Sequence, residues 1–151
     1  MPVRLLACLL FAALPSLGMS QTAAGSFDVD LKPQAPAEGD ASNVGRMTIN
    51  KTFHGDLSAT SVGQMLAFMT MTPGSAGYVA MERVTGTLAG RTGAFTLQHT
   101  GSMNRGEPSL SVTVVPDSGT EGLTGLTGTM QIDARAEGHR YTFDYALPAS
   151  E

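Results

Sequence analysis

Two side chains that could exchange protons, Glu82 and His99, lie in one glycine-rich stretch over residues 82–101. Each lies two residues from an apolar residue and so has its parity: Glu82 with Val84, and His99 with Leu97. Because side chains alternate between the two faces of a strand, residues of one parity share a face. A carboxylate and an imidazole are therefore expected on the apolar, inward side, where they could perform acid–base chemistry.

Other strands are expected to direct polar groups the same way. Lys51, Tyr141 and Tyr145 also share parity with apolar neighbours. A buried charge is costly unless it is paired, so Lys51 and Glu82 are expected to neutralise each other, with His99 and a tyrosine completing the hydrogen bonds. Three interpretations stay open: a polar cluster in the mouth or floor of a ligand cavity, a structural network whose members satisfy one another, or a bulge that turns one of these side chains to solvent.

Methionines form a second group of one parity: Met65, Met69 and Met71. Thioethers of an exported protein can bind cuprous ion, but spacing alone is weak evidence for such a site, and methionine more often fills an irregular interior or lines an adaptable apolar pocket. The histidines stand on separate segments without the spacing of metal ligands, so no metal site is expected.

The sequence also argues against several function classes. It contains no Gly-x-Ser-x-Gly nucleophile motif, and its glycine-rich loops lack the Gly-Lys-Ser/Thr ending of a phosphate-binding loop. Their glycines are those of hairpin turns, and no cofactor is expected. The chain carries 9 basic and 13 acidic residues without a basic run, so nucleic acid is not an expected partner.

The elements that position these residues are predicted to be strands. Alternating segments recur at short spacing between turn signals, and nothing after the first twenty residues has helical periodicity. Short turns between successive strands, together with the advantage of removing exposed edges, predict a single eight-stranded antiparallel up-and-down β-barrel. The expected strands cover residues 27–31, 44–53, 57–71, 77–88, 94–103, 110–115, 129–133 and 141–147.

The N-terminus has the pattern of a secretory signal. Arg4 precedes an apolar run over residues 5–17, and small residues come before a possible cut after Ser20. The only cysteine, Cys8, would be discarded, so the mature protein is expected to be exported to the periplasm or outside the cell, without a disulfide and with no membrane partner once the signal is removed. The predicted organisation is a signal peptide over 1–20, a flexible lead-in over 21–26, a barrel domain over 27–147 and a tail over 148–151.

Several motifs together resemble one bacterial family, the domain of unknown function numbered thirty-two twenty-four. The motifs are Thr52–Leu57, Glu82–His99, Val114–Thr120 and Tyr141–Tyr145. The family is similar in fold to allene oxide cyclase-type barrels, which implies an eight-stranded antiparallel barrel here. It has no established activity, so the resemblance assigns no catalytic role; it implies only that Glu82, Arg83, Gln98 and His99 belong to a shared motif.

We expect this barrel to bind a small, partly apolar molecule in its interior. One alternative is a cofactor-independent isomerase or cyclase in which Glu82 or His99 moves a proton, and another is a non-enzymatic structural or interaction module that uses the outer strand faces. The expected ligand-binding residues are Lys51, Phe53, Met65, Met69, Glu82, Phe95, His99, Tyr141, Phe143 and Tyr145.

Overall fold

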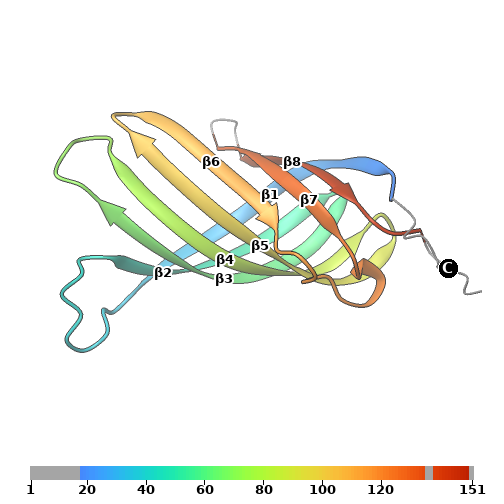
Figure 1. Cartoon of the computed structure of the whole chain (residues 1–151), viewed down its shortest axis with the longest axis horizontal. Coiled ribbons are helices and arrows are strands. Elements are labelled where there is room, and N and C mark those ends of the chain that lie inside the picture. The colour runs from blue at the N-terminus through green and yellow to red at the C-terminus, as the bar shows by residue number, and fades with distance from the viewer. Residues whose placement is uncertain (1–17, 135–137, 150–151) are drawn as a thin grey trace, which may run out of the picture.

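Eight antiparallel strands follow one another in chain order around a closed barrel in the computed structural model, which describes residues 18–134 and 138–149 (Figure 1). The predicted fold class is thereby confirmed. A short 3-10 helix, η1 (Glu121–Leu123), precedes β7. The strands are β1 (Ser20–Gln34), β2 (Gly45–Gly55), β3 (Leu57–Met69), β4 (Ala76–Leu88), β5 (Arg91–Asn104), β6 (Glu107–Val114), β7 (Thr127–Asp133) and β8 (His139–Ala146).

The first strand is longer than the sequence pattern indicates. Residues 21–26, expected to be a loose lead-in, form the first half of β1 and pair with β8. Small residues hide the alternation here: Ala23 is buried, and Gly25 packs so closely against His54 and the Tyr141 ring that a side chain would not fit. The predicted signal segment lies, up to residue 17, outside the described residues.

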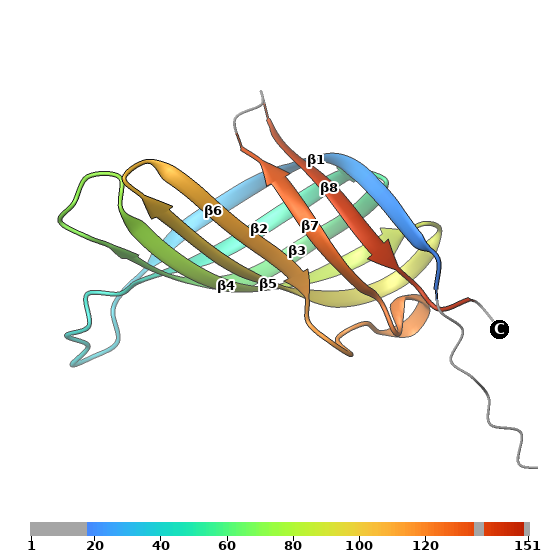
Figure 2. The ribbon, with the colours of Figure 1, turned by 45° about the horizontal axis from the view of Figure 1, so that its top comes forward.

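The strands are strongly staggered around the barrel. The first half of β1 pairs with β8, and its second half pairs with β2. Among the described residues, β6 and β7 pair only at Thr113 and Thr129, and the first half of β6 pairs only with β5. Figure 2 shows the ends of β3 to β6 extending past β7 and β8. One half of the barrel is therefore fully enclosed, and the other ends in an open mouth.

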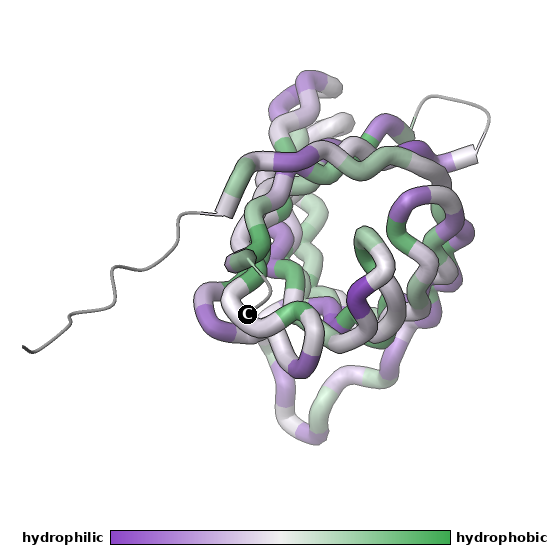
Figure 3. The backbone as a smooth tube through the Cα atoms, turned by 90° about the vertical axis from the view of Figure 1, so that its right-hand side faces the viewer, coloured by the Kyte–Doolittle hydropathy of each residue, from purple (hydrophilic) through white to green (hydrophobic). Residues whose placement is uncertain are grey.

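The enclosed half contains the hydrophobic core. Phe95 of β5 stacks on Phe143 of β8 with ring centroids 5.8 Å apart, and Phe143 stacks on Tyr145 of the same strand with centroids 5.4 Å apart. The segment after β6 closes this end, since Leu123 and Leu126 are fully buried and Thr120 N–H donates to the Ala94 carbonyl at 2.8 Å. Figure 3 shows the backbone nearly end on, forming a ring around this interior.

The stacked core predicts which substitutions in β8 destabilise the fold. Phe143→Ala removes a fully buried ring and should lower the free energy of unfolding by about 3–5 kcal/mol. Thr142→Ala, at the adjacent exposed position, is the matched control and should change it by less than about 0.5 kcal/mol. Urea denaturation measures both, and equal effects would contradict the assignment of Phe143 to the core.

Candidate functional site

A buried carboxylate, that of Glu82 on β4, receives polar groups from two neighbouring elements. Lys51 Nζ on β2 donates to Glu82 Oε2 at 2.8 Å, and Ser61 Oγ on β3 donates to Oε1 at 2.5 Å. The Ser61 hydroxyl in turn accepts from the Lys51 backbone N–H at 3.1 Å. All three residues are buried, and Glu82 is 0% exposed. The predicted pairing of Lys51 with Glu82 is present.

His99 on β5 completes this group, which we call the ionic cluster (Lys51, Ser61, Glu82 and His99). Its Nε2 lies 2.9 Å from Glu82 Oε2, the oxygen that also receives Lys51. The contact is close but lacks the geometry of a regular hydrogen bond, and Nε2 has no other hydrogen-bond partner among the described residues. The imidazole and the carboxylate are therefore in electrostatic contact.

The surroundings keep Glu82 ionised. Burial raises the pKa of its carboxyl group, but the contacts with His99, Lys51 and Ser61 outweigh burial and hold the pKa at about 2. The ammonium group of Lys51 also lies 4.7 Å from the centroid of the Phe27 ring, a cation–π distance. The cluster is thus a paired buried charge, and every strand from β2 to β5 contributes to it.

The tyrosines expected to complete this cluster are bonded elsewhere. Tyr141 Oη accepts from Leu57 N–H at 3.0 Å and lies 3.2 Å from the His54 carbonyl. Tyr145 Oη donates to Gln21 Oε1 at 2.7 Å. Ser61 occupies the role foreseen for a tyrosine. Its inward parity was visible in the sequence, but parity does not tell which inward side chain reaches the carboxylate.

Beyond the ionic cluster, the open half of the barrel holds a cavity of about 500 Å³, here called the mouth cavity. Its walls come mainly from inward-facing positions of β2 to β6 and from the β3–β4 turn. Apolar side chains predominate, and none of the lining residues is charged. The principal side chains are Met47, Met65, Met69, Tyr78, Met103 and Leu110.

The predicted ligand-binding residues separate into three groups in the structure. Met65 and Met69 line the mouth cavity, whereas Met71 is exposed in the turn after β3. Lys51, Glu82 and His99 form the ionic cluster. The aromatic members are buried in the packed core: Phe53, Phe95, Tyr141, Phe143 and Tyr145.

Four of the principal side chains of the mouth cavity were not among the predicted ligand-binding residues: Met47, Tyr78, Met103 and Leu110. Each has the inward parity of its strand, so the signal was available in the sequence. The register explains their convergence, because Met47 is opposite Met65 while Met69 and Met103 are both paired with Ala76. The stagger of the strands, which alternation does not reveal, decides that these positions fall in the unfilled half.

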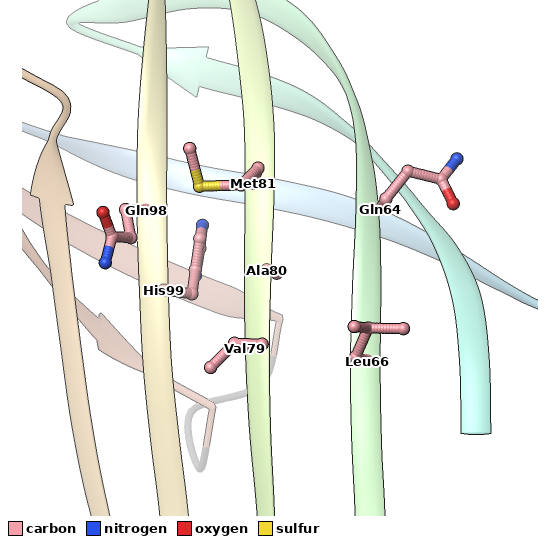
Figure 4. Close-up of a pocket in the computed structure, with 7 residues that line it drawn as sticks. All are labelled: Gln64, Leu66, Val79, Ala80, Met81, Gln98 and His99. Carbon is pink, nitrogen blue, oxygen red and sulfur yellow. The ribbon is translucent and has the colours of Figure 1, made fainter. Parts of the chain in front are cut away.

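The outer wall of the barrel carries a different feature. A shallow depression of about 350 Å³ crosses β3, β4 and β5, and Figure 4 shows the side chains that line it. Leu66, Val79 and Met81 on this face are about half exposed, at 45%, 51% and 48%. His99 also contributes to the lining but is only 2% exposed. This face is an apolar surface rather than an entrance to the ionic cluster.

Within residues 18–134 and 138–149, no group of three His, Cys, Asp or Glu residues could hold a metal ion. In the same part of the chain, no helix has both the length and the apolar character needed to cross a membrane.

Comparisons with known proteins give a consistent result. A family model described as "Protein of unknown function (DUF3224)" matches residues 23–145. The crystal structure of a protein with unknown function from this family, from Shewanella oneidensis MR-1, is similar with a TM-score of 0.80 and 45% sequence identity. The similarity covers 87% of this chain and 100% of that chain. No curated protein matches the sequence.

The ionic cluster predicts a specific pH dependence of stability. The pKa of Glu82 is about 2 in the fold, below its ordinary value of 4.5. The ionised carboxylate therefore stabilises the fold fully above about pH 4.5, and this stabilisation is lost as the pH falls toward 2. A shift of this size corresponds to roughly 3 kcal/mol.

The measurement compares urea denaturation of the unmodified protein and Glu82→Gln at several pH values between about 6 and 2. The unmodified protein should be the more stable at the upper end, and the difference should shrink by roughly 3 kcal/mol toward the lower end. Glu107→Gln, at an exposed glutamate, is the matched control and should stay within about 0.5 kcal/mol throughout. A difference for Glu82→Gln that does not change with pH would contradict the assignment.

Proposed function

The chain belongs to the DUF3224 family of proteins of unknown function, and we propose that it binds a small, partly apolar molecule in the mouth cavity. The observation that carries this proposal is the cavity itself. Its volume of about 500 Å³ falls in the range of small-molecule sites, and its walls are predominantly apolar.

The contrast between the two halves of the barrel supports a binding role for the mouth cavity. The enclosed half is filled by interlocking aromatic and aliphatic side chains, as protein interiors normally are. The open half instead leaves apolar side chains facing solvent, with Met69 81% and Met103 43% exposed. Exposed apolar surface gathered around a concavity is typical of a binding site. Methionine suits such walls because its unbranched side chain adapts to irregular shapes.

The ionic cluster supports the cavity from below. Along β4 the inward positions run from Tyr78, which lines the cavity, through Ala80 to Glu82. We propose that Lys51, Glu82 and His99 act on the ligand through this support, by holding β2 to β5 in register at the base of the site. Direct contact with the ligand is assigned to the cavity-lining residues.

The state of Glu82 favours binding over proton-transfer catalysis. A general base must reach the proton that it abstracts and must be free to accept it. Glu82 is fully buried, does not line the mouth cavity and is occupied by Lys51, Ser61 and His99. Its low pKa also makes it a weak proton acceptor. The isomerase or cyclase alternative therefore receives no support from this carboxylate.

A second candidate, an interaction module, is favoured by one observation. Apolar side chains of β3 and β4 are exposed together on the outer face: Val62, Leu66, Phe68, Val79 and Met81. A contiguous patch of this kind is typical of an interaction surface. It is only shallowly hollowed and carries no feature that defines a partner, so the mouth cavity remains the better supported site.

We also propose that the protein acts outside the cytoplasm. The proposal rests on the N-terminal signal pattern over residues 1–20. It agrees with a sequence whose only cysteine, Cys8, lies within the segment to be removed. The ligand would then be a molecule of the periplasm or the cell exterior.

The binding proposal predicts that a side chain filling the cavity weakens ligand binding. Ala67→Phe places a ring in the mouth cavity and should weaken the binding of a neutral apolar dye by roughly tenfold or more. Leu66→Phe, one residue away on the outer face, is the matched control and should leave affinity unchanged. Fluorescence titration measures both variants.

The location of the bound dye can be followed through isotope-labelled methionine methyl groups. The resonances of Met47, Met65, Met69 and Met103 should shift on titration, whereas that of Met81 on the outer wall should not. Binding that shifts Met81 alone, or that survives Ala67→Phe unchanged, would refute the cavity as the site. Native mass spectrometry of protein isolated from its own cells would show whether a small molecule copurifies.

A further inference from the structure

The distribution of charge around the mouth cavity restricts the kind of molecule that it can hold. None of its lining residues is charged. The nearest buried cation below it, Lys51, is 2.8 Å from the Glu82 carboxylate and is neutralised by it. The ligand carboxylate of a fatty acid or an aromatic acid would therefore find no free cation in the cavity. Burying an unpaired charge is unfavourable, so an anionic ligand is disfavoured.

A cationic ligand meets the same obstacle. The only carboxylate of the ionic cluster, Glu82, already receives Lys51 and Ser61 and contacts His99. The charged residues of the β5–β6 turn, Arg105 and Glu107, are of opposite sign, exposed and outside the cavity lining. No charge of either sign is thus available to pair with a buried ligand charge.

Among the polar side chains that line the cavity, Tyr78 is the one at an inward strand position, since Thr70, Thr72 and Ser75 belong to the β3–β4 turn and Ser102 and Ser109 stand at outward positions of β5 and β6. Tyr78 lines the cavity and is partly buried, and its hydroxyl has no hydrogen-bond partner within residues 18–134 and 138–149. Its ring lies directly over Gly101 of β5, which has no side chain to displace it. Burial and the nearby Glu82 carboxylate raise the pKa of Tyr78, so the phenol stays protonated at neutral pH and can donate a hydrogen bond.

The methionines make polarity, rather than shape, the main basis of selection. Four of them, Met47, Met65, Met69 and Met103, surround the cavity and can adjust to ligands of different outline. They cannot compensate an unpaired charge, because a thioether is only a weak acceptor. Discrimination between ligands of equal size should therefore follow their charge and their ability to accept a hydrogen bond.

We propose that the mouth cavity selects an uncharged, largely apolar molecule with one hydrogen-bond acceptor, such as a carbonyl oxygen, that receives the Tyr78 hydroxyl. This inference rests on the proposed binding function and narrows it to one class of ligand. Tyr78 is the specificity residue, and Gly101 is the position that lets its ring lie over β5.

Three naphthalenes substituted at the same ring position test the inference. Acetylnaphthalene is a neutral ketone, naphthoate is its anionic counterpart of similar shape, and isopropylnaphthalene has the same shape without an acceptor. Their affinities for the full chain near neutral pH are measured by titration of the labelled methionine methyl groups. The ketone should bind more tightly than naphthoate by roughly tenfold or more.

Variants then test the role of Tyr78. Tyr78→Phe should weaken binding of the ketone by roughly two- to tenfold, as expected for one lost hydrogen bond. The affinity for isopropylnaphthalene should not change. Gly101→Ala forces the Tyr78 ring to move while keeping its hydroxyl, and should also lower the preference for the ketone over isopropylnaphthalene. The methyl resonance of Met81, on the outer wall, serves as an internal control for nonspecific binding.

The outcomes separate this inference from the proposed function. If all three probes bind with equal affinity, binding stands and the selection of neutral acceptors is overturned. Naphthoate binding as tightly as the ketone overturns it as well, and so does a ketone preference that persists unchanged in Tyr78→Phe. If no probe shifts the cavity methionines, the proposed binding function itself fails, and with it the inference.

Discussion

One buried carboxylate must have its charge and hydrogen bonds paired, and the rest of this structure depends on that constraint. Glu82 is removed from solvent, and its charge is balanced by Lys51 on β2, Ser61 on β3 and His99 on β5. Each partner must stand at one position of its strand, so the cluster specifies the register of four consecutive strands at once. A slip by one residue would turn each of these side chains to the opposite face and leave a buried charge without a partner.

This cluster also marks a boundary inside the barrel. On one side the aromatic rings of Phe53, Phe95 and Phe143 are buried in a continuous core. On the other side β2 to β6 run on toward the mouth, beyond the single described pairing of β6 with β7. The core stabilises the fold, and the stagger of the strands leaves an interior that it does not fill. Rigidity and space for a ligand are thus provided by different parts of the same sheet.

The mouth cavity combines adaptable walls with little available polarity. Methionine side chains give it variable shape, and the pairing of Lys51 with Glu82 withholds the nearest buried charges from a ligand. At the inward strand positions of the cavity, Tyr78 is the polar side chain whose hydroxyl has no hydrogen-bond partner among the described residues. Under the proposed binding function, a site of this composition would distinguish ligands by charge and hydrogen bonding and would tolerate variation in outline. Its openness to the mouth also distinguishes it from the outer apolar face of β3 and β4, which lies on the opposite side of the same strands.

Local pattern was sufficient to predict the class of fold and the direction of the important side chains. Alternation and short turns indicate eight antiparallel strands, and the inward parity of Lys51, Glu82 and His99 follows from the same rule, including the pairing that burial demands. The pattern failed where small residues conceal alternation, as in the first half of β1 around Gly25.

What only the tertiary structure decided is how the inward residues of different strands meet. Parity assigns a residue to a face but carries no information on the stagger between strands, and the stagger determines which layer of the barrel each residue enters. The assembled sheet therefore decides that Ser61, and not a tyrosine, lies beside Glu82. It also decides that the aromatic residues lie in the filled core. The same assembly brought Met47 and Met103 to join Met65 and Met69 around a cavity, because the packing of a closed barrel depends on all of its strands together.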